Sequence, residues 1–310
     1  INKLCGSGMK ATMFAHDNIL AGSHDVMVAG GMESMSNAPY ILLDARTGMR
    51  MGHGEVKDHM FLDGLEDAYE PGKLMGAYAE ATAQSYQFTR ESQDAFAITS
   101  LERARKATED GTFAKEIVPV TVKSRKGETV VEIDEQPGNA IPEKIPNLRP
   151  AFAKDGTVTA ANSSSISDGA AALILMRQSE SEKRGLKPLA VILAHTTHAQ
   201  EPEWFTTAPI GAIKKVLDKT GWDKDDVDFY EINEAFAVVT MAAMQDLGIS
   251  HDKVNVHGGA CSLGHPVGAS GARIIVTLLN ALEKYDKTKG VASLCIGGGE
   301  GTAIAIERVN

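Results

Sequence analysis

Cysteine is scarce in this sequence, because Cys5, Cys261 and Cys295 are the only three among 310 residues. So few cysteines cannot build the dense disulfide framework of a small secreted protein, and an odd number leaves at least one thiol free. No Cys-x-x-Cys pair and no His-Glu-x-x-His segment occurs, so the common metal-binding signatures are absent. We therefore expect a reducing compartment and predict no metal site.

Long apolar runs and basic clusters are also absent. Gly, Ser or charged residues interrupt every apolar stretch before it reaches the roughly 20 residues that span a bilayer. The net charge is −10, and Lys and Arg are scattered among acidic residues. We expect a soluble protein that binds neither membranes nor nucleic acid.

The first residues carry no targeting information. The chain begins with Ile1, and Ile-Asn-Lys-Leu resembles neither a signal peptide nor a transit peptide, so we expect the natural N-terminus to be missing. A cytoplasmic location is predicted, and a mitochondrial or peroxisomal one stays open.

The first part of the chain shows one helix and one strand of a core, followed by a long excursion. With 43% hydrophobic residues, the chain can bury a core in one large or two ordinary domains, and we expect a compact α/β protein. A helix is predicted from Gly6 to Leu20, then a buried strand over residues 25–29 that ends in a tight turn at Gly30-Gly31. Residues 33–160 mix Gly, Pro, Met and charge, so we expect them to leave this core.

Regular elements are predicted within the excursion and after it. One helix over residues 77–107 and a polar strand around 118–133 are expected in the excursion. After it, strands and helices alternate, which favours a mainly parallel sheet with helices on both faces. Strands are expected at 168–176, 189–194, 227–232, 254–256, 291–296 and 302–307, and helices at 210–219, 235–247 and 273–285.

The two ends of the chain look duplicated. Gly6-Ser7-Gly8, a helix and a strand ending in Gly30-Gly31 correspond to Ala269-Ser270-Gly271, a helix and a strand ending in Gly297-Gly298-Gly299. Any helix and strand with flanking glycines could align this well, so coincidence is the alternative.

Cys5 is the first candidate for chemistry. It lies where a loop turns into a helix, and a helix N-terminus favours an anion. Such a position lowers a cysteine pKa and produces the nucleophilic thiolate. A buried structural cysteine is the alternative interpretation.

His265 is the second candidate. It lies in the glycine-dense segment Gly258–Gly271 directly before a helix, and its small neighbours leave room for a substrate. The ordinary pKa of imidazole lies near working pH, so a neutral His265 could take a proton from Cys5. A surface histidine is the alternative.

Two further segments could serve the same site. Cys295 ends a predicted strand before Gly297-Gly298-Gly299, whose exposed amides could hold an oxyanion. The glycine spacing differs from a dinucleotide-binding motif. Asn233 follows another predicted strand, where it could cap a helix, orient a water or polarise a carbonyl. Cys295 could equally be an ordinary core residue.

Four segments together resemble the active-site motifs of the thiolase family in order and spacing: Leu4-Cys5-Gly6-Ser7-Gly8, Asn233-Glu234-Ala235-Phe236, Gly264-His265-Pro266-Val267-Gly268 and Cys295-Ile296-Gly297-Gly298-Gly299. The resemblance covers the whole chain. It implies a thiolase-like fold of two duplicated α/β halves with layered helices and sheets. The implied N-terminal domain is residues 1–180, truncated before the nucleophile and including a loop domain over about 33–160, and the C-terminal domain is residues 181–310.

The resemblance implies a reaction and a role for each catalytic residue. The expected enzyme is an acetyl-CoA C-acetyltransferase of fatty acid metabolism, which condenses two acetyl-CoA to acetoacetyl-CoA and CoA or reverses this by thiolysis. Cys5 would carry the acyl group, His265 would activate it, and Cys295 would exchange the α-carbon proton. The amides of Cys5 and Gly297 would form one oxyanion hole, and His265 with a water on Asn233 would form the other.

The resemblance also implies binding residues, partners and assembly. Ala160, Ser163 and Ser164 would line the pantetheine arm, and Leu65, Met75, Ile166 and Phe236 would wall the acyl tunnel. A methionine at position 75 narrows the acyl site and argues for short-chain substrates. Coenzyme A enters as part of the substrate, so no cofactor is expected. A homotetramer, as a dimer of dimers, is expected, with the loop domain covering the site and assisting assembly.

Other functions remain as alternatives. A ketoacyl synthase of the same superfamily generally needs two histidines, and Cys295 argues against it. A degradative 3-ketoacyl-CoA thiolase for longer chains would use the same catalytic groups. A non-catalytic acyl-CoA-binding protein of thiolase-like fold, or an inactive fragment, would not require the catalytic residues, yet all of them are present.

Overall fold

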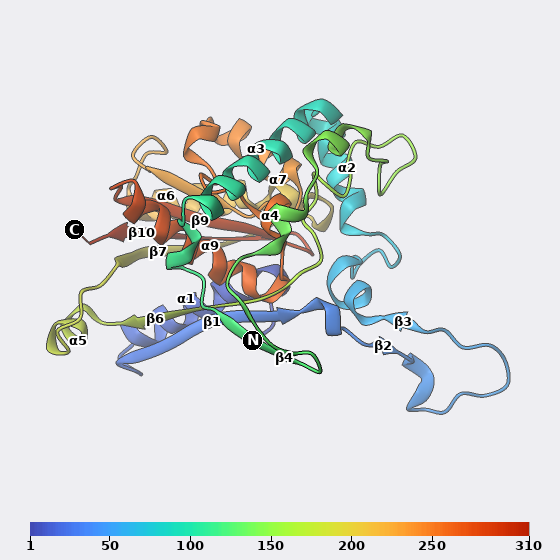
Figure 1. Cartoon of the computed structure of the whole chain (residues 1–310), viewed down its shortest axis with the longest axis horizontal. Helices are drawn as coiled ribbons and strands as arrows, with labels where there is room; N and C mark the ends of the chain where they lie inside the picture. Colours follow the sequence, from blue (N-terminus) through green and yellow to red (C-terminus); the bar gives the residue numbers. More distant parts are fainter. Residues whose placement is uncertain (310) are drawn as a thin grey trace.

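Two sheets enclose a pair of helices in the computed structural model, which describes residues 1–309. The first sheet pairs β1 (Val26–Ser34) with β6 (Asp168–Met176) in antiparallel register. The second has the order β7-β10-β9-β8. Helices α1 (Ser7–Leu20) and α9 (Val267–Lys284) pack against each other between the sheets (Figure 1).

The second sheet is mixed, so the expected mainly parallel sheet is wrong. It contains β7 (Ala190–Ala199), β8 (Phe229–Ile232), β9 (Lys289–Ile296) and β10 (Glu300–Arg308). Only β8 and β9 run parallel. The strand-helix alternation is broken between β9 and β10, where a glycine turn with positive φ at Gly298 and Gly299 makes a hairpin. Helix α6 (Ala208–Thr220) covers the outer face of this sheet.

The first strand does not stop at its glycines. β1 continues through Gly30 and Gly31 to Ser34, so the predicted turn at this point is wrong. A Cβ on Gly30 would collide with the Ala171 carbonyl of β6, and one on Gly31 would collide with the Gly268 backbone of α9. These glycines therefore allow close packing of neighbouring backbones rather than a change in chain direction.

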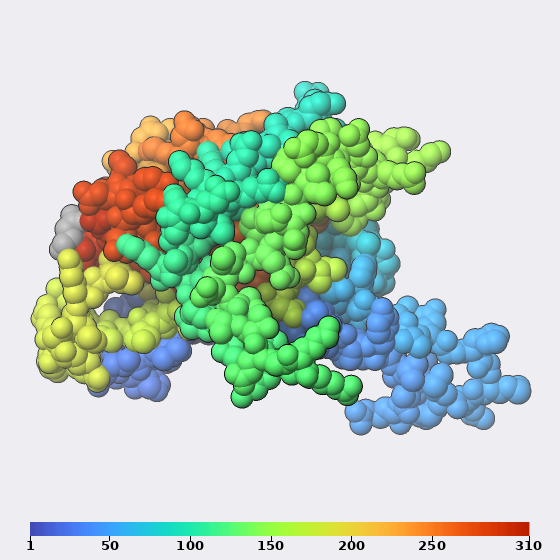
Figure 2. Space-filling model, viewed as in Figure 1, coloured from blue at the N-terminus to red at the C-terminus, as the bar shows by residue number. Residues whose placement is uncertain are grey.

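Residues 35–167, which connect β1 to β6, contribute no strand to either of these two sheets. Their predicted single helix is two helices, α2 (Met75–Tyr86) and α3 (Arg90–Glu109), because Gln87 is left-handed with φ 57° and Thr89 caps α3 at the amide of Ser92. The polar stretch is a hairpin of β4 (Val120–Ser124) and β5 (Gly127–Val131), whose residues are all exposed. Figure 2 shows residues 40–60 and this hairpin protruding from the body.

The predicted strand over residues 254–256 is also wrong. Val254 makes one isolated bridge to Tyr230, and the positive φ of Asn255, 49°, ends the extended conformation. The remaining elements are β2 (Tyr40–Ile41), β3 (Lys57–Asp58), the π-helix η4 (Phe61–Leu65), α4 (Glu135–Asn139), α5 (Gln178–Lys183), α7 (Ala237–Leu247), α8 (Ala260–Leu263) and the 3-10 helices η1 (Leu4–Gly6), η2 (Met35–Asn37), η3 (Leu43–Ala45), η5 (Phe113–Lys115), η6 (Pro142–Asn147), η7 (Pro202–Thr207) and η8 (His251–Lys253). Within residues 1–309, no helix combines the length and apolar character needed to cross a bilayer.

A buried histidine gives the fold a specific pH dependence. His257 lies beside the rings of Phe113 and Tyr285, and neither of its ring nitrogens has a hydrogen-bond partner among the described residues. Burial, assisted by Lys284, lowers the pKa of His257 to about 4. The unfolded chain, with an ordinary value near 6.5, binds more protons in the window between these values. Neutral His257 therefore contributes stability above pH 6.5 that is lost as pH falls through 4.

We expect His257→Gln to reduce this acid sensitivity. As pH falls from 7 to 4, the free energy of unfolding of the variant should rise relative to that of the unaltered protein, by at most about 1.4 kcal/mol per pH unit. Urea unfolding at several pH values measures the difference, with exposed His24→Gln as the matched control. A constant difference across this range would contradict the prediction.

Candidate active site

A strained turn presents Cys5 at the start of α1. Leu4 has a positive φ of 48°, which is uncommon for a residue with a Cβ, and η1 leads directly into α1 at Ser7. The Ser7 hydroxyl donates to the Leu4 carbonyl at 2.8 Å and accepts from the Lys3 amide at 2.8 Å. The turn is therefore held by its own side chain, and it fixes the direction of the Cys5 sulfur.

The environment of Cys5 favours the thiol. Burial raises the pKa of Cys5 to about 11, the nearby Glu33 carboxylate raises it further, and the amides of Gly297 and of Cys5 itself oppose this rise. The sequence-based expectation of a pKa lowered by the helix N-terminus is wrong, since desolvation outweighs the amide contribution. Cys5 therefore needs a neighbouring base to become a nucleophile.

His265 is buried between α8 and α9 as a neutral imidazole. Burial lowers the pKa of His265 to about 4, and the positive charge of Arg273 adds to this effect. Ser270 donates its hydroxyl proton to the Pro266 carbonyl at 3.0 Å, so its oxygen can accept from His265 Nδ1 at 2.5 Å. This arrangement leaves Nε2, which is buried without a partner among the described residues, with a free lone pair. His265 is thus equipped to accept a proton.

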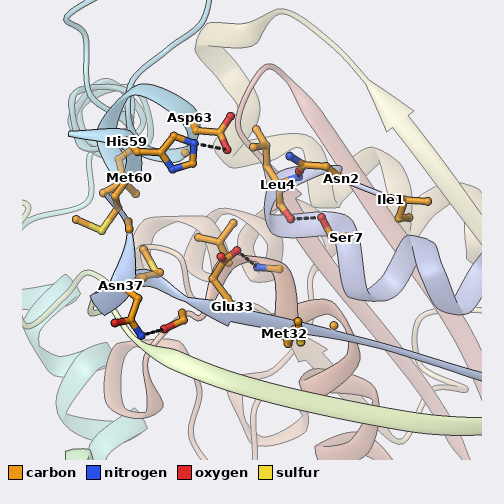
Figure 3. A pocket seen from close by; sticks show the side chains of 18 of the residues that line it. Ile1, Asn2, Leu4, Ser7, Met32, Glu33, Asn37, His59, Met60 and Asp63 are labelled. Atoms are coloured by element: carbon orange, nitrogen blue, oxygen red, sulfur yellow. Dashed lines mark hydrogen bonds and ion pairs between the residues drawn. The ribbon is translucent and has the colours of Figure 1, made fainter. Parts of the chain in front are cut away.

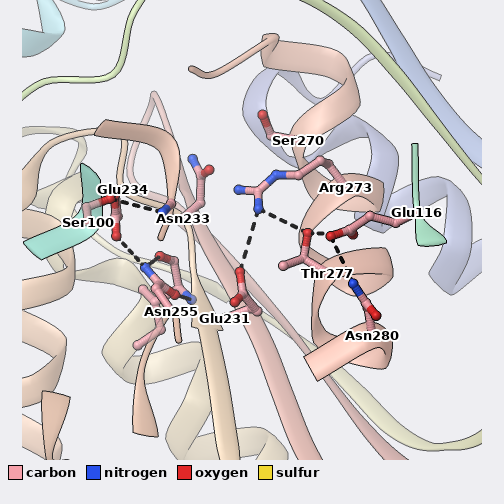
Figure 4. Close-up of polar contacts among 12 residues, drawn as sticks. Ser100, Glu116, Glu231, Asn233, Glu234, Asn255, Ser270, Arg273, Thr277 and Asn280 are labelled. Atoms are coloured by element: carbon pink, nitrogen blue, oxygen red, sulfur yellow. Dashed lines mark hydrogen bonds and ion pairs between the residues drawn. The ribbon is translucent and has the colours of Figure 1, made fainter. Parts of the chain in front are cut away.

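Asn233 stands beside His265 on a rigid polar network. Its amide nitrogen Nδ2 lies 3.5 Å from His265 Nδ1, and its buried Oδ1 has no partner among residues 1–309. The next residue, Glu234, accepts from Ser100 Oγ at 2.7 Å and Asn255 Nδ2 at 2.8 Å (Figure 4). Asn233 does not cap α7, because that helix begins at Ala237 with Phe236 in the capping position.

Glu234 is a site-supporting residue that the sequence reasoning did not single out. It is fully buried, and burial raises its pKa while its hydrogen bonds to Ser100, Asn255 and the Cys261 amide oppose that rise. A glutamate within the apolar run around residues 229–243 is a detectable signal, because a buried carboxylate requires several donors. Its fixed position orients the loop that carries Asn233.

Cys295 lies next to Cys5 at the end of β9. It is fully buried, and burial, with a smaller contribution from the neighbouring Cys5, raises the pKa of Cys295 well above its ordinary value. Met75 and Phe236 belong to the same hydrophobic cluster as Cys295. Met75 Sδ would lie 3.1 Å from a Cβ at Gly297, so the methionine packs directly on the glycine turn. The structure therefore gathers Cys5, Cys295, Gly297, Met75 and Phe236 in one region.

The helices α1 and α9 bring their two starting loops together. A Cβ on Gly8 would lie 2.7 Å from the Ala272 amide nitrogen, so the backbones touch near both N-termini. Cys5 precedes α1 by two residues, and His265 precedes α9 by two residues. The close packing of the helices sets the spacing between these loops.

The predicted binding residues separate into two groups. Ser163 forms an isolated β-bridge with Phe236, and the Ser164 amide donates to the Ala235 carbonyl at 3.0 Å, so both lie beside Phe236. The Ser163 hydroxyl is buried without a partner among the described residues. Ala160 and Ile166 from the same segment are exposed, and Ile166 has 54% of its surface accessible.

Leu65 lies apart from the cluster of Met75, at the edge of a cavity. This cavity has a volume of about 510 Å³ and is lined by residues from η1, β1, η4 and the start of α9. Figure 3 shows Leu4, Glu33, His59 and Asp63 around it. Glu33 accepts from the Gly268 amide at 3.0 Å, which joins β1 to the helix after His265. Leu65 therefore borders the active-site loops without joining the cluster of Met75.

Two known protein families match this chain. The family described as "Thiolase, N-terminal domain" matches residues 1–179, and "Thiolase, C-terminal domain" matches residues 186–308. This chain belongs to the thiolase family. The thiolase fold expected from the motifs is thereby confirmed.

Named relatives of this thiolase carry one activity in their names. The "Acetyl-CoA acetyltransferase" of Allochromatium vinosum is 48% identical over 100% of this chain and 79% of its own length. "Acetyl-CoA acetyltransferase 2" of Arabidopsis thaliana is 51% identical over 99% of this chain and 77% of its own. "Acetyl-CoA acetyltransferase, cytosolic" of Mus musculus is 50% identical over 98% and 77%.

Solved structures agree with this thiolase in fold. The acetyl-CoA acetyltransferase of Bacillus anthracis superposes with a TM-score of 0.96 at 43% identity, covering 100% of this chain and 78% of that one. The Acat5 thiolase of Ascaris suum, in complex with coenzyme A, gives a TM-score of 0.93 at 45% identity with coverages of 100% and 78%.

We expect Ser270 to position His265 in this thiolase. Ser270→Ala removes the hydroxyl that holds Nδ1, which frees the ring to turn and to change tautomer. The turnover number for condensation should fall by roughly tenfold or more, and the acid limb of the pH-rate profile should move.

Steady-state kinetics between pH 5 and 9 test the Ser270 prediction. The matched control is Ser181→Ala on α5, because Ser181 is also a buried serine that donates to a backbone carbonyl, that of Leu186, at 2.7 Å. Equal turnover and an unchanged profile in Ser270→Ala would show that the ring is held by its surroundings alone.

Proposed function

We propose that this protein is an acetyl-CoA C-acetyltransferase that condenses two acetyl-CoA molecules to acetoacetyl-CoA and CoA, and that catalyses the reverse thiolysis. The observation that carries this proposal is the convergence of two thiols and two backbone amides. The Gly297 and Cys5 amides face the Cys5 sulfur, and Cys295 lies close enough for its pKa to respond to Cys5. The names of the relatives support the same activity.

In the first half-reaction, Cys5 takes the acetyl group. His265 accepts the Cys5 proton at Nε2, and the sulfur attacks the thioester carbonyl of acetyl-CoA. The amides of Cys5 and Gly297 stabilise the oxyanion of the tetrahedral intermediate. The C–S bond to coenzyme A breaks, and the CoA sulfur leaves with the proton that His265 returns. Acetyl-Cys5 and free CoA are the products.

In the second half-reaction, a carbon–carbon bond forms. Cys295 passes its proton to His265, and the resulting thiolate removes a proton from the α-carbon of a second acetyl-CoA. His265 with a water held by Asn233 stabilises the enolate oxygen. The carbanion attacks the carbonyl of acetyl-Cys5, and the C–S bond to Cys5 breaks. The Cys5 sulfur leaves as thiolate and takes up the proton held by His265, and acetoacetyl-CoA is released.

The proposed acyl specificity rests on the packing of Met75. Met75 lies against Gly297 in the cluster that contains Phe236 and Cys295, where its side chain would narrow the acyl site. We place Ser163 and Ser164, with Ala160, along the pantetheine arm, and Leu65 and Ile166 at the outer tunnel. Coenzyme A is carried in as part of the substrate, and the reaction uses no other cofactor.

We propose a cytoplasmic location, a role in fatty acid metabolism and a dimer of dimers. The mouse relative has "cytosolic" in its name, which supports the location. The exposed face of the β1-β6 sheet supports association, because Val28, Met32 and Ile174 have 70%, 82% and 70% of their surface accessible. The proposed domains are residues 1–180, with a loop domain over about 33–160, and residues 181–310.

Mass spectrometry after incubation with acetyl-CoA tests the proposed function. We expect one acetyl group on the Cys5 peptide, and its loss when free CoA is added. Condensation and thiolysis assays with acetyl-CoA, acetoacetyl-CoA and a longer 3-ketoacyl-CoA then test specificity, with the short substrates expected to react fastest. A protein that binds acetyl-CoA without acetylating Cys5 would be the non-catalytic alternative. Faster thiolysis of the longer 3-ketoacyl-CoA would instead identify the protein as a degradative thiolase for longer chains.

A further inference from the structure

A second cluster of chemically active side chains lies at the other end of α1. Within residues 1–309, His16, Asp17 and His195 are a group whose potential metal-ligand atoms all lie within 4.8 Å of one another. His16 and Asp17 belong to α1, and His195 belongs to β7 of the four-stranded sheet. His16 is eleven residues beyond Cys5 along this helical segment, about 16 Å at 1.5 Å per residue, so the cluster is separate from the active site.

The ligand atoms converge on one point. Asp17 Oδ1 lies 2.9 Å from His195 Nε2 and 3.6 Å from His16 Nδ1. The two imidazole rings meet edge to face with centroids 5.3 Å apart. One carboxylate oxygen is thus flanked by two ring nitrogens, which is the donor set that zinc accepts in three-ligand sites.

One ligand nitrogen of the cluster lacks a close partner. His16 Nδ1 is buried, and its 3.6 Å distance from Asp17 Oδ1 is too long for a normal hydrogen bond. A metal ion bound between these two atoms would give the buried nitrogen a partner.

The charges around the cluster also suit a cation. Asp17 supplies one negative charge, and α1 ends three residues later at Leu20, where free carbonyls favour positive charge. The Asp17 side chain is 52% exposed, so an ion can enter and a water molecule can complete its coordination.

We propose that His16 Nδ1, Asp17 Oδ1 and His195 Nε2 bind one zinc ion, with water as the fourth ligand. The two nitrogen ligands favour zinc over magnesium or calcium, which prefer oxygen. The ion ties α1, which follows the nucleophile, to β7 at the edge of the second sheet. The acetyl transfer proposed above does not use it. Motif spacing cannot detect this site, because 178 residues separate Asp17 from His195.

Zinc titration of the purified, chelator-treated protein tests the site. We expect one zinc ion per chain and a thermal midpoint several degrees higher with zinc. His16→Gln, Asp17→Asn and His195→Gln should each weaken binding by about tenfold or more. His24→Gln, an exposed histidine four residues after the same helix, is the matched control and should bind as the unaltered protein does.

Cobalt substitution distinguishes this site from the cysteines. The proposed ligands contain no sulfur, so the cobalt protein should lack a thiolate-to-metal charge-transfer band, and Cys5→Ser should keep the site. Asp17→Asn changes a half-exposed side chain without changing its shape, so it reports on binding even where a histidine variant folds poorly. Absence of zinc binding, equal affinity in all three variants, or loss of binding in Cys5→Ser would each overturn the proposal and leave Asp17–His195 as a hydrogen bond only.

Discussion

Cys5→Ser is expected to abolish formation of the acetyl-enzyme and to lower turnover by about 10⁴-fold or more. A serine hydroxyl is far more basic than a thiol and a weaker nucleophile, and His265, with its pKa lowered to about 4, is a weak base. Even for the thiol the step is demanding, because burial raises the pKa of Cys5 to about 11. Quenched incubation with radioactive acetyl-CoA, followed by counting of label on the protein, measures the effect.

Cys261→Ser is the matched control for this experiment. Cys261 is the third thiol, and its Sγ lies 3.8 Å from the Glu234 carbonyl, on the supporting network rather than beside Gly297. We expect this variant to acquire label at close to the normal stoichiometry. Label that accumulates normally in Cys5→Ser would assign the nucleophile to another residue.

Cys295→Ser is expected to separate the two half-reactions. Acetylation of Cys5 requires the thioester carbonyl, the two amides and His265, all of which remain, so the variant should still acquire label. Condensation requires removal of an α-carbon proton, and a serine in the apolar surroundings of Met75 and Phe236 cannot ionise for this purpose. Condensation should therefore fall by about 10³-fold or more while labelling persists.

The measurement for Cys295→Ser compares two assays on one preparation. Radioactive labelling reports the first half-reaction, and exchange of the acetyl-CoA methyl protons with deuterated water reports deprotonation. We expect labelling without exchange. Label on Cys295→Ser together with its absence from Cys5→Ser would establish the assigned roles, and the opposite pattern would reverse them.

The chain motifs indicated much of the site before the fold was known. Cys5, Cys295 and Gly297 converge, as their positions in a loop and at a strand end suggested. Backbone amides are exposed at such positions, so they can face the Cys5 sulfur. The helix after Cys5 and the strand over residues 168–176 also matched, since strong hydrophobic periodicity survives in the folded chain.

Other predictions failed where long-range contacts override local pattern. Gly30 and Gly31 signalled a turn, yet they lie inside β1 because Ala171 and Gly268 approach their backbones. The expected parallel sheet became mixed because the β9-β10 hairpin has no helix in its connection. Neither feature can be read from neighbours in sequence.

The sequence by itself determined the family, and it placed two thiols, one imidazole and one amide in the order of the thiolase motifs. Only the tertiary structure decided their protonation. Burial keeps Cys5 a thiol and His265 neutral, because desolvation depends on how many segments cover a group. The tertiary structure also brought His195 to Asp17, since the meeting of a helix with a strand from the other sheet depends on the path of the whole chain.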